Sequence, residues 1–322
     1  MGVKIQSIGS YRPKQSPEDA LEHKKSLEGE SEWEEWINFV AGNLPIAYSS
    51  SYQETAMNLA SHAIADCLEK SRTPADQIDL IIHLCNIPDH LLGEATKIQR
   101  LIGATHAASY QIKNTACAGV LAAFLQASIF INSGIYEKVL VVCVSNLALN
   151  ARKIMDIQDA HLEDLATATL FSKCEGQSGF INFHSETKSE WERISYLLPL
   201  DHSKTGGLRG NGDLNKFHDV LAQGSAKTMK QALEKASLQS KDISWLITLN
   251  AREEFLDLWR QGIGIEESRH LHTFHEVENC SFSSIPYTLM RSVEQNKLQH
   301  KDKVLFFAQG SGLHLISLVW EW

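Results

Sequence analysis

The sequence predicts a mixed α/β protein built from two similar halves, and three observations carry this prediction. Short runs rich in β-branched residues alternate with amphipathic helical stretches, which is typical of a mostly parallel sheet covered by helices. Two segments, 67–86 and 232–251, repeat the same order of helix, acidic turn and apolar strand. The chain has 322 residues, more than a single hydrophobic core usually spans. We therefore expect a duplicated α/β unit.

The elements of the first half follow from its local patterns. The start, GVKIQSIGSY, predicts a first strand, and the polar, irregular stretch 14–50 predicts an excursion over the surface. Beyond it the patterns predict strands at 78–85, 108–112 and 138–146, with helices at 93–103 and from Cys117 onward.

The second half repeats this order after its own strand. A helix at 253–263, a strand at 268–275, a helix from near Cys280 and a strand at 302–312 are expected. The copies meet near residue 175, so we predict an N-terminal half over 1–175 and a C-terminal half over 176–322. Cys117 and Asn279 then come at nearly equivalent places, each at the entrance of the third helix of its half, and the two helix N-termini can converge.

Composition excludes several classes of function. The net charge of −9 disfavours binding to nucleic acid or to an anionic membrane surface. No apolar run is long enough to span a bilayer, and the start lacks a basic leader, so we expect a cytoplasmic protein. The six cysteines form no Cys-x-x-Cys pair, which predicts neither disulfides nor a metal site.

Cys117 stands where a polar stretch changes to an apolar helical pattern. A helix N-terminus stabilises a thiolate, and Asn114 and Thr115 are candidate capping residues. The small neighbours in ACAG (116–119) leave room for an acyl group. Cys117 is therefore a candidate nucleophile; the alternative is a small buried hydrophobic residue.

Several ordered motifs resemble one known family. ACAG is similar to the ACSG around that family's nucleophile, and further matches are EWI (35–37), PDH (88–90), GNGDLNKF (210–217), ENCSFSSIP (278–286) and the Gly310-Ser311-Gly312 turn. The sequence resembles the β-ketoacyl-acyl-carrier-protein synthase III branch of the thiolase-like superfamily, from about Ile5 to the last residue.

The resemblance implies a five-layered αβαβα subunit with two pseudo-symmetric halves, normally paired in a dimer. It implies that Cys117 takes an acyl group from a coenzyme A or acyl-carrier-protein thioester, with no permanently bound cofactor. Asn279 corresponds to the family's catalytic asparagine, and the backbone N–H groups of Cys117 and Ser311 to its oxyanion donors. Gly310 and Gly312 flank Ser311, and Trp36 corresponds to a residue at the coenzyme A entrance.

The resemblance fails at the family's catalytic histidine, whose position is taken by Leu249. Leucine can neither hold a proton nor donate to a thioester oxygen. Asn250 could donate a hydrogen bond if the strand end shifts by one residue. His275 and His314 are the candidates for a replacement base.

Two further departures concern the partners. At the coenzyme A entrance an arginine is replaced by Val40, and a basic residue of the carrier-protein docking surface is replaced by Glu254. An acidic group there repels an acidic carrier protein, and the neighbouring Arg252 can compensate.

Three functional hypotheses follow. The first is an acyltransferase of the ketoacyl synthase III type, in fatty acid, polyketide or specialised-metabolite biosynthesis, that passes the acyl group from Cys117 to an acceptor without the standard decarboxylation. The second is a non-catalytic or regulatory subunit that pairs with an active paralogue. The third is a decarboxylating condensing enzyme with a replacement base. A homodimer and a heterodimer both fit the sequence.

Overall fold

The computed structural model describes residues 2–13, 55–89, 93–113, 115–146, 163–176, 178–191, 196–198, 207–209 and 214–322. The excursion predicted over 14–50 lies outside these residues. So do several positions singled out from the sequence: the EWI motif at 35–37 with Trp36, Val40, His90, Asn114 and the first four residues of GNGDLNKF, 210–213.

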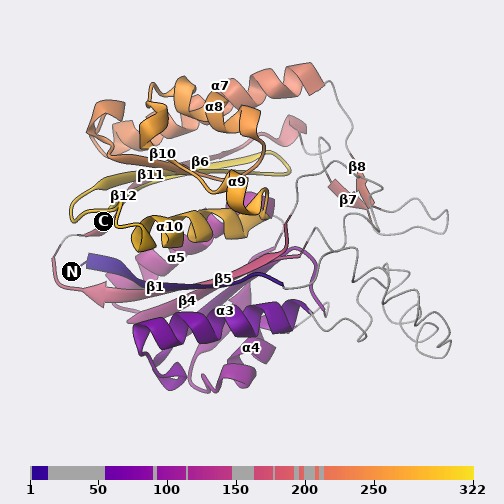
Figure 1. The fold of residues 1–322 in the computed structure, drawn as a ribbon, viewed down its shortest axis with the longest axis vertical. Coiled ribbons are helices and arrows are strands. Elements are labelled where there is room, and N and C mark those ends of the chain that lie inside the picture. Colours follow the sequence, from indigo (N-terminus) through magenta and orange to yellow (C-terminus); the bar gives the residue numbers. More distant parts are fainter. Residues whose placement is uncertain are drawn as a thin grey trace.

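Five layers are stacked in the subunit, as Figure 1 shows. Helices α7 (Leu214–Lys235) and α8 (Glu253–Gly262) cover one outer face, and α3 (Ala56–Ser71) and α4 (Glu94–Ile102) cover the other. Two sheets lie inside them, and α5 (Gly119–Asn132) and α10 (Ser284–Glu294) fill the space between the sheets. This is the αβαβα arrangement expected from the sequence.

The first sheet has the strand order β1-β5-β4-β2-β3. Its parallel part joins β2 to β3 on one side and to β4 on the other, while β5 runs antiparallel to β1 and β4. The strand bounds are Gly2–Tyr11 for β1, Leu80–Cys85 for β2, Ala108–Gln111 for β3, Lys138–Ser145 for β4 and Leu165–Cys174 for β5. The predicted strands and helices of this half are thus confirmed within a few residues.

The second sheet has the order β10-β9-β11-β12-β6. Its strands are β6 (Gly179–Thr187), β9 (Trp245–Thr248), β10 (His270–Leu271), β11 (Lys303–Gly310) and β12 (His314–Glu321), and a separate hairpin pairs β7 (Tyr196–Leu198) with β8 (Gly207–Arg209). The middle of this sheet repeats the first, because β9 lies parallel to both β10 and β11. The described strands of the first sheet end at Cys174 and those of the second begin at Gly179; the division into halves at residue 175 stays a prediction.

The strand predicted over 268–275 is mostly wrong. Only His270 and Leu271 pair with β9, at the edge of the sheet, and the chain then enters the one-turn helix α9 (Phe274–Val277). The alternation of side chains along a strand therefore does not determine the directions of the His272 and His275 side chains, which lie beyond β10.

Helix α5 is apolar on nearly every side because both sheets pack against it. Phe124 at its centre lies 4.9 Å from the ring of Phe171 in the first sheet and 6.5 Å from Phe306 in the second, measured between ring centroids. The hydrophobic pattern that marks this helix in the sequence is thus explained by burial between two layers.

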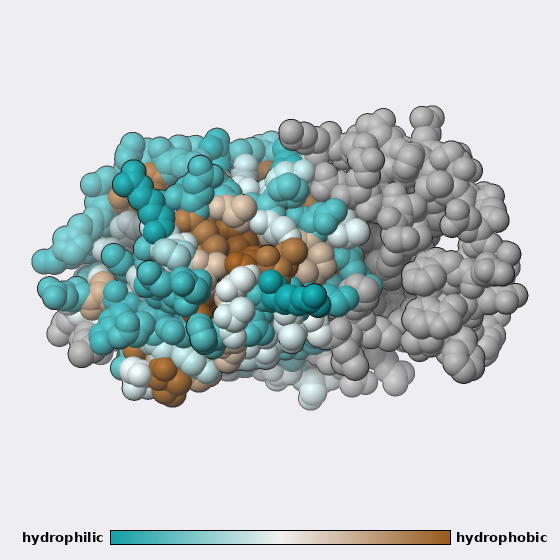
Figure 2. Space-filling model, turned by 90° about the horizontal axis from the view of Figure 1, so that it is seen from below, coloured by the Kyte–Doolittle hydropathy of each residue, from teal (hydrophilic) through white to brown (hydrophobic). Residues whose placement is uncertain are grey.

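The face covered by α3 and α4 carries a cluster of hydrophobic surface near its middle, surrounded by hydrophilic residues (Figure 2). Leu101 of α4 is 59 % exposed. Contiguous apolar surface of this kind favours association with another protein surface.

Candidate active site

Two turns related by the duplication meet between the sheets. Each begins with a non-glycine residue at positive φ, Ala116 at 43° and Ser281 at 47°, followed by a single 3-10 turn and then by α5 or α10. In the duplication, Ala116 is therefore equivalent to Ser281, and Cys117 is equivalent to Phe282. The near-equivalence of Cys117 and Asn279 expected from the sequence is displaced by three positions, because Asn279 comes before the turn.

The thiol of Cys117 contacts the serine of the opposite turn. Its Sγ lies 3.0 Å from Oγ of Ser281, and this is the only side-chain hydrogen bond of Cys117 to the described part of the chain. Asn86, directly after β2, donates from Nδ2 to the same Oγ at 3.2 Å. Because the serine oxygen already accepts this bond, its single hydroxyl proton is free to point at the sulfur.

Asn279 is connected to Cys117 through the same serine. Its Oδ1 accepts from the backbone N–H of Ser281 at 2.9 Å, and its carbonyl accepts from the N–H of Glu163 at 3.1 Å. The preceding residue, Glu278, has a φ of 44°. Asn279 thus fixes the strained turn that carries the serine.

The Gly-Ser-Gly turn packs directly on the turn of Cys117. A Cβ atom at Gly310 would lie 2.1 Å from the carbonyl oxygen of Thr115 and 3.1 Å from the backbone nitrogen of Ala118. Gly312 has a φ of 106°, which favours glycine. The duplication and the terminal turn therefore bring Cys117 and the segment around Ser311 together.

The local environment of Cys117 does not match the lowered pKa expected from its place before a helix. Burial raises the pKa of the thiol, and the hydrogen bonds from Ser281 and from its own backbone offset this only in part. Thr115, one of the two expected capping residues, makes no side-chain capping hydrogen bond.

Leu249, at the position expected for the family's histidine, is packed into the hydrophobic core. Leu249 is 2 % exposed and belongs to the main hydrophobic core. Asn250 is fully buried beside it and donates from Nδ2 to Oγ1 of Thr273 at 3.1 Å, while its Oδ1 has no partner among the described residues. None of the hydrogen bonds between described residues joins Asn250 to Cys117.

The two candidate replacement bases lie in different places. His275 is a surface residue, 71 % exposed at its side chain, with Nε2 3.4 Å from Oε1 of Glu253. His314 begins β12 directly after the Gly-Ser-Gly turn, where Nδ1 lies 3.0 Å from Oγ1 of Thr187. A Cβ atom on Gly312 would lie 2.9 Å from Nε2 of His314, so this ring is beside the turn that packs against Cys117.

Glu254, at the position expected for the family's basic docking residue, forms an ion pair. Its Oε1 lies 3.4 Å from Nε of Arg252, and both side chains are largely exposed. The two side chains thus form a surface ion pair, and compensation by Arg252 in docking a carrier protein stays a prediction.

Two family models match the chain on either side of this site. The model for 3-oxoacyl-(acyl-carrier-protein) synthase III matches residues 113–189, and the model for the C-terminal part of the same family matches 233–322. Together they cover more than half of the chain and include both turns. The chain belongs to the ketoacyl synthase III family. It is an enzyme of this transferase type.

Full-length relatives and solved structures agree with this family. The β-ketoacyl synthase III of Porphyra purpurea is 27 % identical over all of both chains, and that of Trichormus variabilis is 25 % identical over all of this chain and 98 % of its own. The fold matches 3-oxoacyl synthase III of Aquifex aeolicus with a TM-score of 0.78 and 21 % identity, all of both chains being covered. Cerulenin-bound OleA of Xanthomonas campestris matches with a TM-score of 0.77 and 15 % identity, over all of this chain and 97 % of that one.

This ketoacyl synthase III chain has no helix among the described residues that is long and apolar enough to cross a membrane. Sequence reasoning missed two residues of its site, Ser281 and Asn86. Both stood in segments already singled out, Ser281 inside ENCSFSSIP and Asn86 at the end of the repeated segment 67–86. Neither residue carries a sequence signal of its own; the correspondence of the two positive-φ turns, which shows that Ser281 is equivalent to Ala116, is visible only in the structure.

Proposed function

We propose that this chain is an acyl-thioester-dependent acyltransferase in which Cys117 carries the acyl group and passes it to an acceptor without the standard cysteine–histidine–asparagine decarboxylation. The observation that carries the proposal is the 3.0 Å contact between Cys117 and Ser281, together with the buried Leu249 at the position expected for the family's histidine. A serine hydroxyl can stabilise a thiolate by donating a hydrogen bond to it. Unlike a histidine, it cannot take up a proton at neutral pH and so cannot act as a general base.

The first half-reaction needs only groups that lie at this site. The thiolate of Cys117 attacks the thioester carbonyl, a new carbon–sulfur bond forms, and the oxyanion accepts hydrogen bonds from the backbone N–H groups of Cys117 and Ser311. The intermediate collapses with loss of the coenzyme A or carrier-protein thiolate, which takes up a proton. Packing of Gly310 on Thr115 and Ala118 supports the placement of these two donors.

In the second half-reaction a nucleophilic acceptor attacks the acyl-enzyme, the carbon–sulfur bond breaks, and the thiolate of Cys117 leaves. Where the acceptor is an amine or an alcohol, the proton that it loses passes to this thiolate. An amine, an alcohol or a preformed carbanion brings its own reactivity, so the missing histidine is not required. Asn279 acts by holding the turn of Ser281, through its 2.9 Å bond to the backbone of that serine.

Paired subunits are part of the proposal. Among the described residues, strand β3 stands at the edge of the first sheet and pairs with β2 alone, and open strand edges favour pairing with another strand. The hydrophobic surface over α3 and α4 in Figure 2 is a second surface that favours association. Light scattering of the purified protein, alone and with a paralogue, separates a homodimer from a heterodimer and from a monomer.

The proposed reaction is tested by incubating the protein with a panel of acyl-coenzyme A species and measuring its intact mass. We expect an acyl adduct that is absent in Cys117→Ala and retained in Cys174→Ala, which removes another partly exposed thiol. Malonyl-coenzyme A is then added and carbon dioxide is measured; the proposal expects none above background.

Other outcomes favour the alternatives. An absence of adduct with every donor, including acyl-carrier-protein thioesters, favours a non-catalytic subunit that supports a paralogue. Carbon dioxide release that depends on Cys117 favours a condensing enzyme with a replacement base, and loss of that release in His314→Asn but not in His275→Asn would identify the base.

A further inference from the structure

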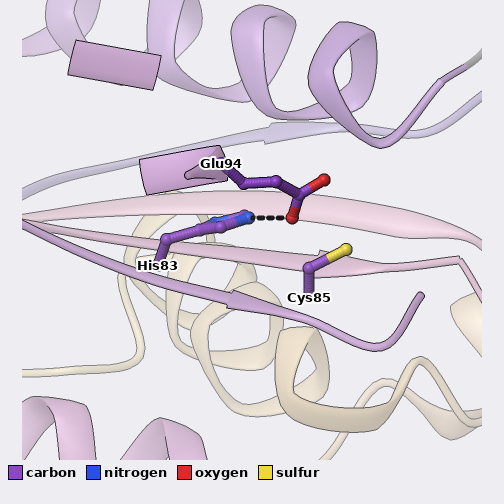
Figure 3. A group of neighbouring side chains, drawn as sticks. All are labelled: His83, Cys85 and Glu94. Atoms are coloured by element: carbon purple, nitrogen blue, oxygen red, sulfur yellow. Dashed lines mark hydrogen bonds and ion pairs between the residues drawn. The ribbon is translucent and has the colours of Figure 1, made fainter. Parts of the chain in front are cut away.

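A second polar cluster lies outside the candidate active site, on the opposite face of β2. His83 and Cys85 project from this strand toward Glu94, the first residue of α4 (Figure 3). Their relative exposures are 1 %, 9 % and 1 %. Nε2 of His83 lies 3.2 Å from Oε2 of Glu94, and Sγ of Cys85 lies within 4.8 Å of both ligand atoms.

The cluster is separate from the nucleophile because side chains alternate along a strand. Cys85 packs with the residues of α3 in the outer hydrophobic cluster, whereas Leu84 belongs to the core around α5. Asn86 reaches Ser281 from that inner side. No atom of His83, Cys85 or Glu94 takes part in the hydrogen bonds described for Cys117.

The outer atoms of this cluster are already held by the backbone. Nδ1 of His83 lies 3.2 Å from the carbonyl oxygen of Val142, to which it can only donate, so Nε2 keeps its lone pair in the neutral ring. Oε1 of Glu94 accepts from the N–H of Asp89 at 2.7 Å. Metal-binding histidines and carboxylates are oriented by outer bonds of this kind.

An acceptor nitrogen and a carboxylate oxygen that face each other need a cation between them, either a proton or a metal ion. We propose that His83, Cys85 and Glu94 bind a zinc ion. Nitrogen, sulfur and oxygen donors suit Zn²⁺, and tetrahedral ligands at about 2.0–2.3 Å place their atoms roughly 3.3–3.8 Å apart. The 3.2 Å separation of Nε2 and Oε2 is already close to this value.

Zinc binding requires rotation of the Cys85 side chain, a turn of the Gln111 amide and the loss of protons. Sγ of Cys85 donates to the carbonyl of Ile87 at 3.2 Å and turns from it toward the metal as the thiol proton leaves. Gln111 supplies a fourth ligand: its Nε2 lies 3.5 Å from Oε2 of Glu94, and turning the amide directs its oxygen inward. The prediction of no metal site rested on the absence of a Cys-x-x-Cys pair and of a His/Cys cluster, and it overlooked the short sequence His83-Leu84-Cys85.

The zinc would stabilise the segment between β2 and α4. Glu94 holds Asp89, and the carboxylate of Asp89 accepts from the N–H groups of Ala56 and Met57 at the start of α3, at 3.0 and 2.8 Å. Asn86, at the beginning of this segment, donates to Ser281. The metal is thus a structural ion that fixes one wall of the site.

The test is the metal content of protein expressed in zinc-supplemented medium. The measurement uses a Cys117→Ala background, so that the nucleophile's thiol does not contribute, and exhaustive dialysis before elemental analysis. We expect about one zinc per chain, at least tenfold less after a further Cys85→Ala change, and no loss after Cys67→Ala, which removes another buried thiol on the same side of the sheet. Zinc below a tenth of an equivalent in the parent protein, or equal zinc in both cysteine variants, would overturn the proposal.

A second measurement keeps the test independent of the folding of Cys85→Ala. Protein prepared with Co²⁺ in place of zinc should show a thiolate-to-cobalt charge-transfer band, and Glu94→Gln should weaken or shift this band while keeping an oxygen that accepts from Asp89. Cobalt-loaded protein without that band would show that the three residues form only a hydrogen-bonded core cluster.

Discussion

The hydroxyl of Ser281 and the thiol of Cys117 lie 3.0 Å apart although 164 residues separate them in the chain. Each belongs to a positive-φ turn at the start of a central helix, and the duplication brings the two turns face to face. The contact therefore joins the two halves at the thiol that we propose as the nucleophile.

Replacing this serine should make the thiol less reactive. Ser281→Ala removes the hydrogen bond that offsets the raised pKa of Cys117, and a hydrogen bond to a charged group contributes about 1.5–3 kcal/mol, so we expect roughly a tenfold or greater fall in thiolate reactivity at neutral pH. The measurement is the rate of iodoacetamide alkylation of Cys117 against pH. The apparent pKa should move upward.

The matched control is Ser292→Ala, which removes another buried hydroxyl from α10, one that donates to Thr288 within the helix. This variant should leave the alkylation profile unchanged. Equal profiles for the two serine variants would mean that Ser281 only fills space.

Asn86 should act on Cys117 only through Ser281. Asn86→Ala removes the 3.2 Å donor to the serine oxygen and lets the hydroxyl turn away from the sulfur, so alkylation should slow by a smaller factor than in Ser281→Ala. In a double-mutant cycle the second change should add almost nothing, because the two residues form one chain of hydrogen bonds. Additive effects on the alkylation rate would show that Asn86 acts by another route.

Gly310 should tolerate no side chain. In Gly310→Ala the new Cβ would lie 2.1 Å from the carbonyl of Thr115, so the turn of Cys117 must move; overpacking typically costs about 1–3 kcal/mol. We expect lower thermal stability and at least a tenfold loss of acyl-adduct formation. Gly262→Ala is the control, since its Cβ would meet only the side chain and Cα of Ala226, at 3.0 and 3.8 Å. Normal acylation by Gly310→Ala would contradict the close packing of this turn.

His270 should make the fold sensitive to acid. Burial, followed by the charges of His272 and Arg260, lowers the pKa of His270 to about 3, while an unfolded histidine titrates near 6.5. Between these values the unfolded chain binds a proton that the folded chain does not, so stability is complete above pH 6.5 and falls as the pH drops toward 3. The loss is about 1.4 kcal/mol for each pH unit below 6.5.

Urea unfolding at pH 7.5 and pH 5.5 measures this loss. His270→Asn, whose amide can still bond to Thr248, should lose less stability between the two pH values than the parent protein. His300→Asn, at an exposed histidine, should behave like the parent. The same pH dependence in all three proteins would rule out His270 as the acid-sensitive group.

The fold could be predicted from the sequence because α5 and the buried strands are long apolar runs separated by polar turns. The structure brings Cys117 close to Asn279, through Ser281, and close to the Gly-Ser-Gly turn, through Gly310. The catalytic roles of these residues stay a prediction. Ser281 and Asn86 were not selected from the sequence, because a hydrogen bond between residues from three separate segments has no signature in local pattern. The prediction of a lowered pKa for Cys117 was wrong. The sequence shows that the residue stands before a helix, but it does not show the burial that raises the pKa of the thiol. The strand predicted over 268–275 was likewise too long, because β10 lies at the edge of the sheet and pairs with β9 at only two residues.

Leu249 takes the position at which the resemblance places the family's catalytic histidine, and restoring a histidine there tests the whole site. Leu249 is buried, and its backbone N–H donates to Phe307 across the sheet, so the strand end itself is held in place. A histidine at this position introduces a buried polar group, at a cost of about 1–3 kcal/mol unless it finds a partner.

If the pocket otherwise follows the family, Leu249→His should release carbon dioxide from malonyl-coenzyme A, with a rate on the order of 10²-fold above the parent, which is the low end of what an acid–base group contributes. Leu249→Met, a change of similar volume, should give none, and Leu249→His combined with Cys117→Ala should show whether the release needs the acyl-enzyme. Acylation of Cys117 without any gain in carbon dioxide would mean that the pocket differs from the family beyond this one residue. That result would favour an acceptor that brings its own nucleophile to the acyl-enzyme.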